Sequence, residues 1–171
     1  MTGKEHLIIG ITAATAIGLG LLSIDEINSV LNLGTLVIGS SIGSLIPDID
    51  IKTSIASNVF NKILSISLMF LFFYVIISGV NDISISFDFP VILFFIITII
   101  SRSSTHRSFT HKWLGTILYC YSVYLFNNLY LFIGFTSGYL LHIVCDIIKS
   151  NGHIFDFFKF KFTYKKCKRR K

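Results

Sequence analysis

Histidine and aspartate side chains that could bind metal ions occur in four separated stretches of the 171-residue chain. His142 and Asp146 are four residues apart, so on a helix they share one face and can close on a single ion. Asp48 and Asp50 follow Pro47, which ends the preceding helix, and as alternate residues they can present both carboxylates in the same direction. Imidazole and carboxylate groups together suit zinc, manganese or iron.

The other candidate ligands lie near the start of the chain and ahead of its fifth apolar segment. His6 opens the first apolar segment. His106 and His111 are five residues apart, which does not match one helix face, so a loop must supply at least one of them. We expect Ser108 or Thr110 to cap the fifth helix, which places His111 in its first turn.

The elements that position these residues are predicted to be membrane helices. Hydrophobic residues make up 53% of the chain and charged residues only 14%, whereas soluble domains carry about 25% charged residues. We therefore expect an all-α, polytopic membrane helix bundle formed by residues 1–158, with the first segment retained and not cleaved as a signal peptide. The hydrophobic runs predict six segments, at 7–22, 30–46, 63–80, 89–101, 114–127 and 129–147. The fourth and fifth are short for a hydrocarbon core of about 30 Å, so we expect them to tilt, to thin the bilayer or to span it incompletely.

The positions of the charged residues test this map. If all six segments cross, all 15 Lys and Arg residues fall on the N-terminal side, and Asp25, Glu26, Asp82 and Asp88 fall on the other. By the positive-inside rule, both termini are then cytoplasmic, at the cell inner membrane. Residues 159–171 form a basic cytoplasmic tail that we expect to lie on anionic lipid headgroups, in preference to binding nucleic acid.

On this topology, four of the five histidines and three of the nine acidic residues gather at the cytoplasmic face. Each has a simpler explanation by itself, because a lone His is commonly a packing residue and an Asp-x-Asp pair commonly caps a turn. Ionisable groups at membrane depth cost about 2.5–3.5 kcal/mol each, so seven together indicate a metal site. The predicted ligands are His6, Asp48, Asp50, His106, His111, His142 and Asp146. This set exceeds the three ligands of one catalytic zinc, so we expect two divalent ions, with zinc favoured and manganese or iron open.

Four motifs in this order carry a family resemblance: Lys4-Glu5-His6, residues 43–50, His106-Arg107-Ser108-Phe109-Thr110-His111, and residues 138–146. They resemble the YdjM-like family of inner-membrane proteins, which are described as metal-dependent hydrolases, and the likeness covers nearly the whole chain. More distantly, the His142-x-x-x-Asp146 pair is similar to a metal motif of the zinc-dependent phospholipase C and single-strand nuclease superfamily. The amino-terminal Trp that ligates metal in those enzymes is missing here, and His6 would take an equivalent place.

Together these features predict a membrane-bound, phospholipase C-like hydrolase that cleaves a phosphoester bond of a lipid or other amphiphilic substrate. Asp48 or Asp50 would act as general base, while Arg107 and Lys112 would hold the phosphate, Arg107 bidentately in the catalytic centre. Two alternatives stay open: a metal-ion or solute transporter, and a non-catalytic membrane scaffold with a structural metal site. Transport sites usually lie near the bilayer midplane, which disfavours the transporter.

Overall fold

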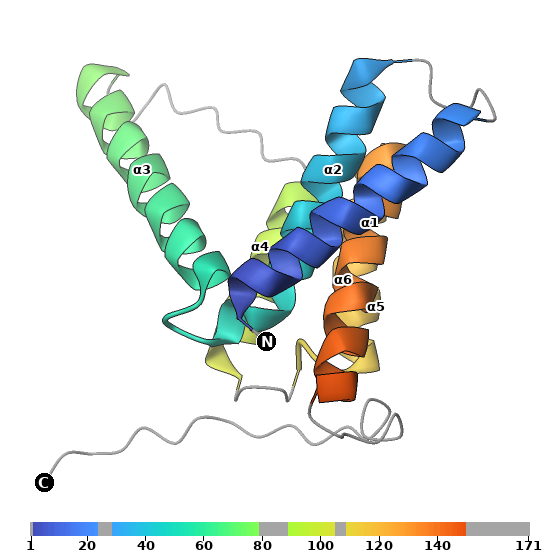
Figure 1. Ribbon diagram of the computed structural model, residues 1–171. Coiled ribbons are helices and arrows are strands. Elements are labelled where there is room, and N and C mark those ends of the chain that lie inside the picture. The colour runs from blue at the N-terminus through green and yellow to red at the C-terminus, as the bar shows by residue number, and fades with distance from the viewer. Residues whose placement is uncertain (1, 24–28, 79–88, 105–108, 150–171) are drawn as a thin grey trace, which may run out of the picture.

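The computed structural model describes residues 2–23, 29–78, 89–104 and 109–149, which form six α-helices and one short 3-10 helix (Figure 1). In chain order the elements are α1 (Gly3–Ser23), α2 (Val30–Leu45), the 3-10 helix η1 (Ile46–Asp50), α3 (Ile55–Ser78), α4 (Phe89–Ser103), α5 (Trp113–Tyr124) and α6 (Leu129–Lys149). No β-strand occurs in these described ranges, so the all-α expectation is confirmed. The basic tail expected at residues 159–171 lies outside them.

Among the residues that the structure describes, three helical stretches are long and apolar enough to cross a membrane, namely Gly3–Ser23, Val30–Asp50 and Leu129–Lys149, of 21 residues each. A helix of this length extends for about 32 Å, which matches a hydrocarbon core of about 30 Å. Helix α4 is equally apolar but has only 15 residues. Large apolar side chains are exposed along these helices, for example Ile38 and Ile148 at 57% and 71%. Such a surface is typical of a protein surrounded by lipid.

Helix α3 begins earlier than the hydrophobic pattern predicts. It starts at Ile55 and not at residue 63. The Ser54 hydroxyl accepts a hydrogen bond from the Ser57 amide at 3.1 Å, and the Ser54 carbonyl accepts one from the Asn58 amide at 3.0 Å. Ser54 thus caps a polar first turn that hydrophobicity cannot reveal. Lys62, expected in a connecting loop, consequently lies within the helix.

Helices α1, α2 and α6 form a tightly packed unit because small residues line their contacts. A Cβ atom on Gly43 would lie 2.1 Å from the Phe135 carbonyl oxygen, and one on Gly138 would lie 2.2 Å from that of Ser40. The backbones of α2 and α6 therefore touch directly, as small residues four apart allow in membrane helices. The Ser40 hydroxyl also donates a hydrogen bond to the Gly10 carbonyl at 2.8 Å, which ties α1 to α2.

Helices α4 and α5 pack beside α6 around the fully buried Tyr119. Its hydroxyl lies 3.0 Å from the Ser101 Oγ and 3.3 Å from the Thr98 Oγ1, so polar contacts join α5 to α4. The Phe94 ring meets the Tyr119 ring edge-on at 5.4 Å. Helix α3 diverges from the remaining helices along its length (Figure 1).

The turn after α2 is the 3-10 helix η1, with Pro47 in its first turn. Pro47 has no N–H group to continue the α-helical hydrogen bonds, so the chain tightens to about three residues per turn. Residues two apart then differ by about 240° around the axis. The extended backbone on which the expected common direction of Asp48 and Asp50 depends is therefore not present in this turn.

Candidate metal centre

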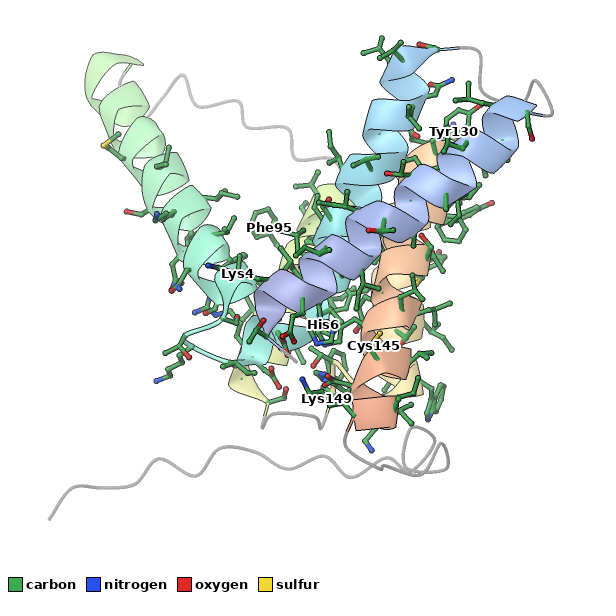
Figure 2. The ribbon with its side chains drawn as sticks, in the orientation of Figure 1. Lys4, His6, Phe95, Tyr130, Cys145 and Lys149 are labelled. Atoms are coloured by element: carbon green, nitrogen blue, oxygen red, sulfur yellow. The ribbon has the colours of Figure 1, made fainter. Side chains whose placement is uncertain are left out.

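Two helices carry candidate ligands on stripes of small residues. The buried residues of α1 are His6, Gly10, Ala14 and Gly18, each four residues after the last. In α6, Gly134, Gly138, His142 and Asp146 repeat the same spacing and are also buried. Because residues four apart share a helix face, the faces that bring the helices together also bring these side chains together. Figure 2 shows His6 at the end of the bundle that carries Lys149.

The first group of potential ligands comprises His6, Asp48 and His142, whose ligand atoms lie within 4.8 Å of one another. The His6 and His142 rings stack with centroids 3.7 Å apart and an angle of 19° between their planes. The Nε2 atom of His142 lies 3.7 Å from Oδ1 of Asp48. Helices α1 and α6 and the η1 turn therefore meet at this point.

The second group comprises His111, His142 and Asp146, again with ligand atoms within 4.8 Å of one another. The Asp146 carboxylate links the two groups, because Oδ1 lies 3.2 Å from Nε2 of His6 and Oδ2 lies 3.4 Å from Nε2 of His111. The two oxygens of one carboxylate thus face different histidines. Asp146 therefore contacts a histidine of each group.

The cluster is almost completely shielded from solvent. The exposed fractions are 2% for His6, 1% for His142, and 8% for both His111 and Asp146. Burying imidazoles with a carboxylate is costly unless each group is paired or bound to a cation.

A backbone hydrogen bond fixes the tautomer of His142. Its Nδ1–H donates to the Ser44 carbonyl oxygen at 2.7 Å, since a carbonyl can only accept. In the neutral ring, Nε2 then carries a lone pair and no proton. This Nε2 is buried without a hydrogen-bond partner among the described residues and faces Asp48. The His142 Nε2 atom and the Asp48 carboxylate are both electron-rich, so a cation between them would offset their repulsion. In metal-bound histidines, the ring nitrogen that does not bind the metal usually donates a hydrogen bond to a group such as a backbone carbonyl.

The distances also fit metal ligation. Ligand atoms about 2.0–2.1 Å from a tetrahedral zinc ion are separated by about 3.3 Å from each other. The closest pairs in the cluster are separated by 3.2, 3.4 and 3.7 Å. Three imidazoles and two carboxylates exceed the needs of one zinc ion and suit zinc, manganese or iron. The described residues therefore fit the predicted metal centre.

Two of the predicted ligands differ from expectation in their positions. His111 does not lie in the first turn of α5, because the helix begins at Trp113 with Lys112 as its N-cap. The Lys112 amide donates to the Phe109 carbonyl at 3.1 Å, which closes a turn before the helix. Asp50 is buried at 4% exposure and belongs to neither ligand group found among the described residues.

Two further predicted site residues, His106 and Arg107, lie outside the described residues. Lys112, predicted to hold phosphate, lies directly beside His111 and is half-buried.

Sequence reasoning missed two groups that position the ligands. One is the Ser44 carbonyl, which leaves no signal in the sequence because it is a backbone atom. The other is Tyr139, whose hydroxyl donates to the Thr110 carbonyl at 2.5 Å and so holds the turn that carries His111. Tyr139 lies three residues before His142 on the buried face of α6, and this spacing could have indicated its role.

Comparison with known proteins supports the conclusion that the chain is a membrane protein. No curated protein and no solved structure matches this chain. The family model described as YdjM inner membrane protein matches residues 1–157, a range that includes every residue of both ligand groups. The chain therefore belongs to the YdjM inner membrane protein family.

Proposed function

We propose that this protein is a membrane-bound, metal-dependent hydrolase that cleaves a phosphoester bond of an amphiphilic substrate. The observation that carries the proposal is the buried Nε2 of His142, oriented by Ser44 and surrounded by two carboxylates and two further imidazoles. One catalytic zinc ion needs three protein ligands, so a centre with five candidate ligands can bind metal and also supply groups for catalysis.

Five residues would hold two divalent ions: His6, Asp48, His111, His142 and Asp146. A carboxylate can bridge two ions, whereas His142 has one lone pair left because its Nδ1–H is engaged by Ser44. We therefore assign the bridge to Asp146, which faces both His6 and His111. The ions would supply an activated water near neutral pH and stabilise the negative charge on the attacking and leaving oxygens.

The remaining roles belong to residues beside the cluster. Asp50 lies in the same turn as Asp48 and outside both ligand groups, so we assign it the role of general base. Arg107 and Lys112, which flank the predicted histidine ligands in the sequence, would donate charge-assisted hydrogen bonds to the phosphate.

The position of the cluster supports an amphiphilic substrate. His6 lies in the first turns of α1 and Asp146 in the last turns of α6, so the ligands gather at helix ends and away from the middle of the apolar stretches. This location also disfavours the transporter, because transport sites usually lie near the bilayer midplane. The substrate would be a phospholipid or a polyprenyl phosphate reached from the bilayer surface.

Metal-dependent release of phosphate tests the proposal. The detergent-purified protein would be incubated with phospholipid and polyprenyl phosphate substrates, with and without zinc, manganese or a chelator. We expect hydrolysis that the chelator abolishes and that Asp50→Asn lowers without loss of bound metal. Metal uptake into proteoliposomes without hydrolysis would instead establish the transporter, and bound metal with neither activity would establish the scaffold.

We further propose six membrane crossings with this site and both termini at the cytoplasm, because in that topology all 15 basic residues lie on one side. Single cysteines at Asn28, Asn81 and Asn128, introduced after replacing the three native cysteines, should react with an impermeant thiol reagent from outside the cell. Labelling of any of them only after the membrane is broken would contradict the topology.

A further inference from the structure

A cavity of about 340 Å³ lies between α3 and the rest of the bundle, apart from the metal ligands. Its walls come from α2, η1, α3, α4, α5 and α6, and every lining residue is apolar. The volume is within the range of about 300–1,000 Å³ that small-ligand sites have. Because every residue that lines the cavity is apolar and the protein is surrounded by lipid, we expect the cavity to bind a hydrocarbon chain.

A cationic group lies beside this cavity. The guanidinium carbon of Arg102, in the last turn of α4, lies 5.0 Å from the ring centroid of Phe60. The Phe60 side chain is itself part of the cavity wall. The Arg102 cation is therefore in contact with an aromatic residue of the cavity wall.

Arg102 lacks a counter-anion in the described part of the chain. Its Nη1 atom is buried and has no hydrogen-bond partner there. The aromatic ring offsets part of the cost of burying the charge but cannot accept hydrogen bonds as an anionic oxygen does. A guanidinium presents a planar fork of donors that matches a phosphate group. The Arg102 side chain is thus suited to an anionic group that the protein does not itself supply.

The η1 turn connects this cavity to the metal centre. Ile46 and Ile49 line the cavity, whereas Asp48, between them in the sequence, faces His142. The cavity thus reaches the end of the bundle where the ligands gather. A lipid bound there would have its polar end near the helix ends and its chain between the helices.

We propose that the cavity and Arg102 form a binding site for an anionic phospholipid. One acyl chain occupies the apolar cavity, and the phosphate accepts hydrogen bonds from the Arg102 guanidinium. The site is argued from the cavity and the cation alone, so it binds lipid whether or not the lipid is the substrate of the metal centre.

Photolabelling of the full chain in nanodiscs tests this proposal. The probes are phosphatidylglycerol and phosphatidylcholine with the same photoreactive acyl chain. Both lipids carry a phosphate, but the choline ammonium of phosphatidylcholine offsets the phosphate charge and is repelled by the Arg102 cation. We therefore expect phosphatidylglycerol to label peptides of α3 and α4, including Phe60 and Phe95, and to do so about tenfold more strongly than phosphatidylcholine. Equal labelling by both lipids, or labelling spread evenly over the exposed apolar surface, would overturn the proposal.

Single substitutions test the contribution of the Arg102 charge to lipid binding separately from that of the cavity. Arg102→Gln should remove the preference for phosphatidylglycerol, whereas Lys62→Gln, at an exposed cation of α3, should keep it. Ala56→Phe should fill the cavity and reduce labelling by both lipids, whereas Ile66→Phe, at a residue of α3 that does not line the cavity, should not. Unchanged labelling in both Arg102→Gln and Ala56→Phe would refute the site.

The thermal unfolding temperature shows that each variant is folded, and metal content is measured in the same samples. Native metal content with lost lipid preference supports the lipid site independently of catalysis. Conversely, a protein that binds lipid as described but contains no metal would end the hydrolase proposal and leave the lipid site standing. Cross-links between two copies of the chain at Phe60 and Phe95, in place of lipid labelling, would show that a second copy occupies the cavity.

Discussion

The Nδ1 atom of His142 lies 2.7 Å from the carbonyl oxygen of Ser44, a residue 98 positions earlier in the chain. This bond joins α6 to the end of α2 and decides which nitrogen of His142 faces the carboxylates. Gly43 and Gly138 let the two helices approach to backbone contact, which favours this bond. The packing of the helices and the chemistry of the site therefore depend on each other.

The proposed bridging role of Asp146 predicts how each ligand affects metal content. Asp146→Ala removes the group shared by both ions, so we expect loss of nearly all bound metal. His111→Ala removes a ligand from one ion only and should leave about one ion per chain. His142→Ala should also lose metal clearly, and elemental analysis of the purified proteins measures all three.

The matched control is His153→Ala, which removes the one histidine that we do not predict to be a ligand. It should retain the metal content of the native protein. Near-zero metal in the native protein, or identical content in all variants, would contradict the metal centre.

Removing the metal should destabilise the protein. A ligand at 100 times its dissociation constant stabilises the folded state by about 2.7 kcal/mol, which for a chain of this size corresponds to a Tm shift of about 5–10 °C. We therefore expect a chelator to lower the Tm of the detergent-purified protein by this amount and zinc to restore it. In Asp146→Ala the same chelator should change nothing, and an equal shift in that variant would show that the effect arises elsewhere.

The close approach of α2 and α6 predicts a sharp difference between two glycines of the same helix. A methyl group on Gly43 would overlap the Phe135 carbonyl, whereas no atom lies within 4 Å of one placed on Gly34. Gly43→Ala should therefore cost about 1–3 kcal/mol through overpacking and weaken metal binding, because His142 shifts relative to Ser44. Gly34→Ala should be neutral or slightly stabilising. Thermal unfolding and metal content measure both effects, and equal behaviour of the two variants would argue against backbone contact.

Much of the fold could be predicted from hydrophobicity because lipid-facing helices must be apolar along their length. The predicted segments at 30–46 and 129–147 agree with α2 and α6 within two residues. The start of α3 could not be predicted in this way, because Ser54 and Ser57 form a polar cap and not an apolar run. The four-residue repeat of glycines was readable in the sequence and would have identified the helix faces that meet.

The site was predicted best where a single helix determines the spacing. His142 and Asp146 lie together because residues four apart share a face, whatever the rest of the chain does. The backbone that relates Asp48 to Asp50 could not be predicted from their alternation, because the segment with Pro47 in its first turn is a 3-10 helix. The hydrogen-bond partner of the His142 Nδ1–H group could not be predicted, since any backbone carbonyl brought near by tertiary packing can accept this hydrogen bond.

The hydrogen bond from Tyr139 to the Thr110 carbonyl predicts a positioning role that can be separated from stability. Tyr139→Phe removes this hydrogen bond, so the turn carrying His111 gains freedom. We expect a loss of about 0.5–1.5 kcal/mol in stability and a reduction of roughly tenfold in metal affinity. Tyr119→Phe is the matched control, because this equally buried hydroxyl contacts Thr98 and Ser101, away from the ligands. It should lose similar stability and keep its metal affinity, as titration with a competing chelator would measure, and a parallel loss of affinity in both variants would mean that Tyr139 acts only through general packing.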